Sequence, residues 1–162
     1  MFKIRIFLTT VLFLLLSKTT SYAFLAETFV PLVHMVDSID PESNAAQDSL
    51  IIPKIIYEES TPSGFFNTWV LTPKAVQDST ISAFFKKISK DDPKQEIGLF
   101  LVPKNEVNLQ SLRPDERKEA LDIEMVNFFE VFGYYPKTVS ATSFDAVSLQ
   151  YLQTHYSVLG AV

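Results

Sequence analysis

The sequence contains no cysteine, so disulfide bonds, thiolate metal sites and a cysteine nucleophile are all excluded. Glycine is also scarce, with four residues in 162, and only two histidines are present. The chain has no Gly-x-Ser-x-Gly elbow, no phosphate-binding glycine loop and no His-Glu-x-x-His motif. Packing alone must therefore hold the core, and the enzyme classes that these motifs define are excluded.

Basic residues are few as well. Aspartate and glutamate number 19 against 14 lysines and arginines, which gives a formal net charge of −5. Lys3, Arg5 and Lys18 lie in the first 23 residues, which contain no acidic residue, so the charge without that segment is −8. Because an acidic chain without a basic run is repelled by phosphate backbones, we expect no nucleic-acid partner.

Residues 1–23 have the pattern of a secretory signal peptide. Two basic residues precede an apolar core at residues 6–16, and residues 21–23 provide the small side chains that a signal peptidase recognises. The alternative is an uncleaved anchor, although this core is well short of the roughly 20 residues that span a bilayer. We therefore expect a secreted or periplasmic (extracytoplasmic) protein, with membrane attachment only through an uncleaved signal segment.

Residues 24–162 are long enough for one domain with a sizeable core. Apolar runs predict strands at residues 29–36, 65–71, 96–103 and 158–162, and residues 138–142 predict a weaker strand of small residues. Helical spacing between them predicts four helices, and residues 60–64 are expected to form a loop. The helix boundary signals are Pro53, Asp78, residues 91–93, Pro114, Gly133 and Ser143.

The first of these helices has an apolar set at helical spacing, made of Leu50, Ile51, Ile52, Ile55 and Ile56. The last is expected to bury Ala146, Leu149 and Leu152. An alternation of strands and helices predicts an α/β fold with a parallel sheet and helices outside it. No helix follows the fifth strand, so two architectures remain: an open five-stranded sheet, or the N-terminal part of a truncated (β/α) barrel.

Two segments resemble a known family. Gly64-Phe-Phe-Asn-Thr-Trp-Val-Leu-Thr-Pro73 is similar to the second-strand signature of polysaccharide deacetylases, the NodB-homology family, and Gln95-Glu-Ile-Gly98 is similar to their His-Glu-Ile-Gly. The segment from Arg117 through Tyr135-Pro136 to Asp145, followed by Tyr151-Leu152, resembles a divergent branch of that superfamily. The resemblance covers most of residues 24–162 and implies a partial (β/α) barrel.

Active members of that family hydrolyse N-acetyl groups with a divalent metal, which an aspartate and two histidines hold beside a catalytic aspartate. Here Leu99-Phe100 stands where the first metal-binding histidine is expected, and Val102 replaces a glutamate of the divergent branch. Asp37 alone stands near the place of the Asp-Asp pair, with Asp40 three residues later. The resemblance thus implies a deacetylase-like chain without a competent metal site or cofactor, and zinc would bind only if the family chemistry persists.

Ligands of parallel α/β folds gather at the carboxyl ends of the strands. This rule selects Asp37 as a remnant catalytic residue and Asp40, Thr72 and Asp145 as substrate-binding residues. Lys104, Asn105 and Ser143 follow strands too. The structural alternatives are a turn residue for Asp37 and a helix N-terminal acid for Asp145.

Several other side chains have structural interpretations. His34 stands three residues before Asp37, so a regular strand points the two side chains to opposite faces, and we expect a packed, hydrogen-bonded histidine. His155, near a helix end, is expected at the surface. Trp69, Tyr134 and Tyr135 are expected in packing roles.

Three hypotheses follow for function. The first is an exported polysaccharide deacetylase-like domain that no longer catalyses deacetylation. The second is a non-catalytic domain that binds a glycan or another cell-envelope polysaccharide. The third is a fragment without an independent function.

Overall fold

The computed structural model describes residues 32–38, 48–102 and 109–162. Its strands are β1 (Leu32–Val36), β2 (Asn67–Leu71), β3 (Gln95–Phe100), β4 (Thr138–Ser140) and β5 (Gly160–Ala161). Its helices are α3 (Ile51–Ser63), α4 (Pro73–Gln77), α5 (Ser79–Asp91), α6 (Pro114–Phe132) and α7 (Ala146–Tyr156), with a 3₁₀ turn η2 (Leu109–Ser111). The expected signal peptide lies outside the described residues, and no described helix is long and apolar enough to cross a membrane.

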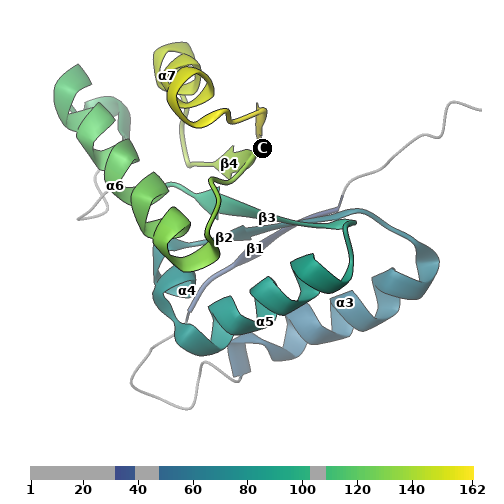
Figure 1. Cartoon of the computed structure of the whole chain (residues 1–162). Helices are drawn as coiled ribbons and strands as arrows, with labels where there is room; N and C mark the ends of the chain where they lie inside the picture. The colour runs from purple at the N-terminus through teal and green to yellow at the C-terminus, as the bar shows by residue number, and fades with distance from the viewer. Residues whose placement is uncertain (1–31, 39–47, 103–108) are drawn as a thin grey trace, which may run out of the picture.

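The five described strands form one parallel sheet in the order β1-β2-β3-β4-β5. This result confirms the predicted α/β fold with five parallel strands and four main helices (Figure 1). Each strand lies beside its predecessor in the sequence. Such a succession is also the strand order in the wall of a (β/α) barrel, whereas doubly wound sheets reverse their order at a switch point.

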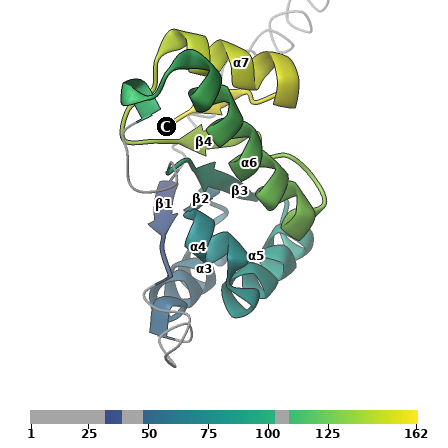
Figure 2. The same cartoon turned by 90° about the vertical axis from the view of Figure 1, so that its left-hand side faces the viewer.

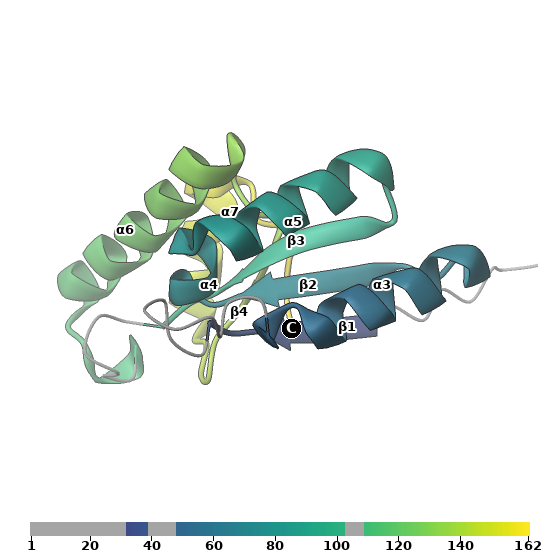
Figure 3. The same ribbon diagram turned by 90° about the horizontal axis from the view of Figure 1, so that it is seen from below.

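The helices lie on one side of the sheet. Helices α3 and α5 run along β1, β2 and β3, and α6 and α7 follow beside the later strands (Figures 1 and 3). The rings of Tyr57 and Phe84 join α3 to α5 at a centroid distance of 6.3 Å. Figure 2 shows the same helices and strands from the side. Right-handed crossovers between neighbouring parallel strands place successive helices on the same face.

The core lies between the helices and the sheet. Trp69 is fully buried and its ring lies 5.4 Å from the ring of Phe85, measured between centroids. The other fully or nearly buried apolar side chains of the core include Leu71, Ile81, Ile97, Leu99, Leu121, Met125, Phe128, Val139 and Leu152. Burial of each such side chain stabilises the fold by about 1.5–3 kcal/mol.

The face of the sheet that points away from the helices, here called the far face, has a different character. The strand register places Val33, Met35, Thr68, Val70, Glu96, Gly98, Phe100, Thr138 and Ser140 on it. On the outermost strand β1, Val33 is 47% exposed and Met35 is 65% exposed. The far face therefore carries exposed apolar side chains at one edge and polar side chains on β3 and β4.

Helix α3 differs from the prediction in two ways. Residues 60–63, expected in a loop, continue the helix, because Gly64 closes it in a left-handed conformation with its N–H directed to the carbonyls of Ser60 and Thr61. The hydroxyl of Thr61 also donates to the carbonyl of Tyr57 at 2.7 Å, which keeps this polar side chain on the helix.

The burial of the apolar set in α3 was also predicted only in part. Leu50 is buried and Ile56 packs against the core, but Ile51, Ile52 and Ile55 are about half exposed or more. Five apolar residues within seven positions span more of the helix circumference than the sheet can cover.

Other element boundaries were partly predicted. Asp78 caps α5, Pro114 begins α6 and Gly133 ends it in a left-handed conformation, as expected. Strands β2, β4 and β5 are shorter than predicted; for example, β5 spans Gly160–Ala161. The short helix α4 after Thr72 was not predicted. The predicted cap Ser143 was wrong, since Asp145 caps α7 and leaves Ala146 exposed and Leu149 half-buried.

Candidate functional site

Two of the predicted site residues meet at the carboxyl ends of β1 and β2. The hydroxyl of Thr72 donates a hydrogen bond to Oδ1 of Asp37 at 2.6 Å. The same Thr72 oxygen accepts from the backbone N–H of Ala75 at 3.2 Å and so caps α4. Because Thr72 is buried and held on both sides, it orients the Asp37 carboxylate, which is exposed to solvent.

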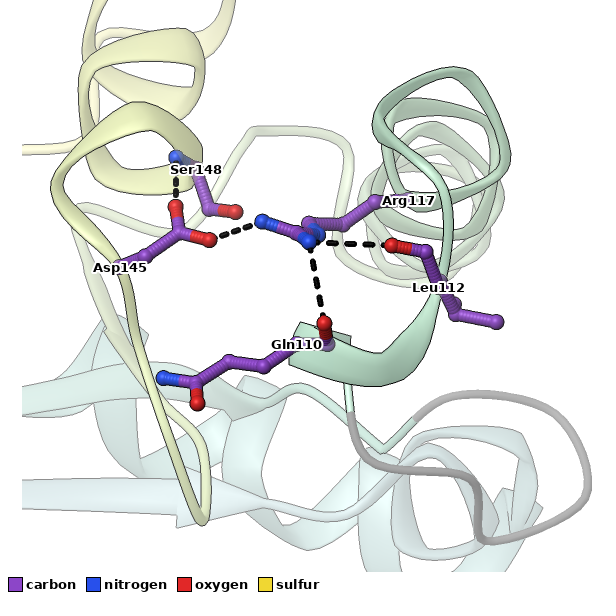
Figure 4. Close-up of polar contacts among 5 residues, drawn as sticks. All are labelled: Gln110, Leu112, Arg117, Asp145 and Ser148. Atoms are coloured by element: carbon purple, nitrogen blue, oxygen red, sulfur yellow. Dashed lines mark hydrogen bonds and ion pairs between the residues drawn. The ribbon is translucent and has the colours of Figure 1, made fainter.

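The third described candidate, Asp145, lies at the carboxyl side of β4, where it has two partners. Its Oδ1 accepts from the backbone N–H of Ser148 at 2.6 Å, which caps α7. Its Oδ2 forms an ion pair with Nη1 of Arg117 (Figure 4). The hydrogen bond from Ser148, followed by the nearby charge of Arg117, lowers the pKa of the Asp145 carboxyl group below its usual value.

Arg117 joins three segments around Asp145. Its Nη2 donates to the carbonyl oxygens of Leu112 at 3.0 Å and Gln110 at 3.3 Å, so the guanidinium ties η2 and the start of α6 to α7 (Figure 4). The Arg117 side chain is only 16% exposed, and its buried Nε has no hydrogen-bond partner among the described residues. A partly buried arginine with these three hydrogen-bond acceptors is a fixed positive group at this edge.

Sequence reasoning missed this pairing. Arg117 was identified from the sequence only as the first residue of a segment similar to a divergent branch of the deacetylase superfamily. No partner was predicted for its side chain. One indication was available: a basic residue stands close to the N-terminus of α6, where the helix dipole favours acidic residues such as Asp115 and Glu116. An arginine in that position needs a carboxylate from elsewhere in the fold, and Asp145 provides it.

The carboxyl end of β3 is apolar. Leu99 and Leu101 are buried, and Phe100 is half-buried on the far face. The backbone N–H of Leu101 donates to the carbonyl of Ser140 at 2.7 Å, which ties this end to β4. Strand β3 thus ends in hydrocarbon side chains, which cannot ligate an ion.

Both histidines of the chain lie elsewhere. Nε2 of His34 is hydrogen-bonded to Oδ1 of Asn67 at 3.1 Å, and its ring lies 4.6 Å from that of Trp69, which confirms the packed, hydrogen-bonded histidine. His155, near the end of α7, contacts the backbone carbonyl of Tyr151 at 3.0 Å and is exposed. Neither histidine is paired with Asp37. This edge therefore has no histidine that could act as a general base for a nucleophile.

The described residues do not fit a zinc ion. In the part of the chain that the structure describes, no three His, Asp, Glu or Cys side chains are grouped closely enough to hold a metal. Catalytic zinc sites use three protein ligands, and Asp37 has a threonine hydroxyl as its neighbour. Asp40, Lys104 and Asn105 lie outside the described residues.

A second polar cluster joins α6 to α7. The hydroxyls of Tyr151 and Tyr156 donate to the carboxylate of Asp122, with Oη–Oδ1 distances of 2.8 and 2.5 Å. Burial, and then the neighbouring Asp122, raises the pKa of both phenols above the usual value near 10. Because every member is paired within the cluster, we interpret it as a structural link between the helices.

The chemistry open to the edge formed by Asp37 and Thr72 is hydrogen bonding. A carboxylate has two oxygens that can accept several hydrogen bonds, and within the described residues Asp37 accepts one, from Thr72. The remaining acceptor sites face solvent and can receive the hydroxyl or amide hydrogens of a ligand.

Comparison of the chain with protein-family models, with curated proteins and with solved structures found no match.

Proposed function

We propose that this chain is an exported domain of the polysaccharide deacetylase-like superfamily that binds a glycan without hydrolysing its N-acetyl groups. The observation that carries the proposal is the pair of Asp37 and Thr72 at neighbouring strand ends, with an exposed carboxylate held at 2.6 Å by a buried hydroxyl. Sugars present many hydroxyl donors, and an oriented carboxylate accepts such donors with charge-assisted strength.

Two further features support the proposal. Successive parallel strands are the order of a (β/α) barrel wall, and ligands of such folds lie at the carboxyl ends of the strands. The apolar end of β3, at Leu99 and Phe100, argues against the metal-dependent hydrolysis that the family resemblance implies. The domain then keeps the place of the ancestral site and uses it for binding.

Binding can be tested with N-acetylated oligosaccharides, such as chitin oligomers and peptidoglycan fragments, by isothermal titration calorimetry. We expect the wild-type protein to bind at least one class and Asp37→Asn to weaken binding about tenfold, since a charge-assisted hydrogen bond contributes about 1.5–3 kcal/mol. Asp91→Asn is the matched control, because Asp91 is an exposed carboxylate at the end of α5. Absence of binding, or equal binding by the wild type and Asp37→Asn, would overturn the proposal.

The non-hydrolytic part needs a separate measurement. Acetate release from the same oligosaccharides is measured with and without added zinc. We expect no release above the rate without protein. Zinc-dependent release that Asp37→Ala abolishes would show that the protein is a deacetylase and would contradict this part of the proposal, whatever the binding data show.

A further inference from the structure

A hollow of about 920 Å³ lies at the opposite edge of the sheet, where the strands begin. Three of its lining residues fix this position. Phe66 immediately precedes β2, Lys94 precedes β3 and Lys137 precedes β4. The last turns of α5 and the end of α6 provide other walls. The hollow is therefore separate from the edge that carries Asp37 and Thr72, and its role does not depend on the function proposed for that edge.

Positive charge gathers around this hollow in a chain whose net charge is negative. Its lining contains Lys86, Lys90, Lys94 and Lys137 but only one acidic residue, Glu96. Within residues 32–38, 48–102 and 109–162, the ion pairs of the structure involve other side chains, so none of the four lysines has a carboxylate partner there. Lys86, Lys90 and Lys94 stand four residues apart along α5 and the turn after it, and Lys137 joins them from the segment before β4.

The single glutamate of the hollow is already engaged. Oε1 of Glu96 accepts from the hydroxyl of Thr138 at 2.8 Å, and Oε2 accepts from the hydroxyl of Thr68 at 3.4 Å. These bonds hold the carboxylate against the far face between β2 and β4. The charge of Glu96 is thus fixed at one wall, and the four ammonium groups are left to attract a negatively charged ligand.

The surfaces between the lysines are mainly apolar. Nζ of Lys94 lies 5.7 Å from the ring centroid of Phe66, and Nζ of Lys86 lies 5.8 Å from that of Phe132, both at cation–π distance. The other apolar lining residues include Ile97, Tyr134 and Leu159. The aromatic rings hold two ammonium groups beside hydrocarbon surface, so the hollow offers positive charge and apolar walls together.

We propose that this hollow, the lysine hollow, binds an amphiphilic anion, in which a carboxylate or phosphate group is attached to an apolar chain. The ammonium groups of Lys86, Lys90, Lys94 and Lys137 bind the anionic group, and the walls around Phe66 and Phe132 take the apolar part. Apolar contact contributes roughly 25 cal/mol per Å² of buried surface, which an inorganic ion cannot use. The volume of about 920 Å³ is large enough for a ligand with an extended hydrocarbon part.

The purified full chain is titrated with octanoate, octyl phosphate, octanol and inorganic phosphate, each below any aggregation of the ligand, and binding is measured by calorimetry. We expect octanoate or octyl phosphate to bind clearly more tightly than the other two. The better of these two identifies a carboxylate or a phosphate as the preferred anionic group. Equal binding of octanol, binding of inorganic phosphate alone, or binding of none of the four would overturn the proposal.

The site is assigned with a double variant. Lys86→Gln together with Lys94→Gln is expected to weaken binding of the preferred anion about fivefold to tenfold, because partly exposed charge pairs contribute up to about 1 kcal/mol each. Lys87→Gln is the matched control, since Lys87 is an exposed neighbour on α5 that does not line the hollow. Equal losses in the control and the double variant would place the anion elsewhere. Circular dichroism checks that both variants are folded.

Discussion

The indole nitrogen of Trp69 donates a hydrogen bond to the side-chain oxygen of Gln95 at 2.9 Å, between β2 and β3. The same oxygen accepts from Nδ2 of Asn67 at 3.1 Å, and Nε2 of Gln95 donates to Asp92 at 3.0 Å. Asn67 in turn contacts His34. Gln95 is therefore the centre of a buried polar network on the helix side of the sheet. These bonds give Gln95 a structural role.

Replacement of Gln95 by leucine should lower the free energy of unfolding by about 2–3 kcal/mol. The buried N–H groups of Trp69 and Asn67 would each lose an acceptor, and an unpaired buried donor costs about 1–3 kcal/mol. Urea denaturation measures the change. Gln150→Leu, on the exposed face of α7, is the control and should alter the value by less than about 0.5 kcal/mol. Equal effects of both substitutions would show that the network contributes nothing specific.

Gly98→Ala should destabilise the protein by about 1–3 kcal/mol. A Cβ at position 98 would lie 2.7 Å from the backbone carbonyl oxygen of Thr138, so β3 and β4 would have to move apart. Thermal unfolding followed by circular dichroism measures the change. Gly160→Ala is a matched control because nothing lies within 4 Å of a Cβ there. A Gly98→Ala protein as stable as the Gly160→Ala protein would mean that the two strands are not held at this spacing.

Much of the fold could be predicted because β2 and β3 contain apolar runs and the longer helices have recognisable boundary residues. Asp78, Pro114 and Gly133 all mark helix ends as expected. The prediction failed where local preference and tertiary context disagree. Residues 60–63 have loop composition, yet Gly64 supplies the left-handed cap that lets α3 extend through them.

The site was predictable only where its members follow strands. Asp37 and Thr72 come directly after β1 and β2, so the parallel register brings them together. Arg117 and Asp145 are 28 residues apart, and their meeting depends on how α6 packs beside α7. In the lysine hollow, Lys94 and Lys137 precede β3 and β4, whereas Lys86 and Lys90 reach the hollow only through the packing of α5, and composition indicated only an acidic chain.

In the Asp145→Asn variant, the free energy of unfolding should depend less on pH in the acid range than it does in the wild type. The pKa of Asp145 is lowered in the folded protein, chiefly by Ser148 and also by Arg117, so this group stabilises the fold above the usual aspartate pKa near 4 and ceases to do so as the pH falls below it. At pH 7 the variant should lose about 1 kcal/mol of unfolding free energy. Urea denaturation at pH 7 and pH 3 checks both points, with Asp91→Asn as the control. A variant that loses as much stability as the wild type between these pH values would contradict the assignment.

Tyr156→Phe should change how the free energy of unfolding depends on pH in the alkaline range. Burial and the carboxylate of Asp122 raise the pKa of Tyr156 above its usual value near 10. The unfolded chain therefore loses this proton first as the pH rises, and the contribution of Tyr156 to stability, fully present below pH 10, declines above it. The variant should lose about 1–2 kcal/mol at pH 8, where the hydroxyl donates to Asp122, and should respond less steeply to pH between 9 and 11. Tyr135→Phe is the control, because Tyr135 lies at the surface with its ring 4.9 Å from that of Tyr156. If urea denaturation at pH 8, 10 and 11 gives parallel profiles for Tyr156→Phe and the wild type, the bond between Tyr156 and Asp122 does not link α6 to α7.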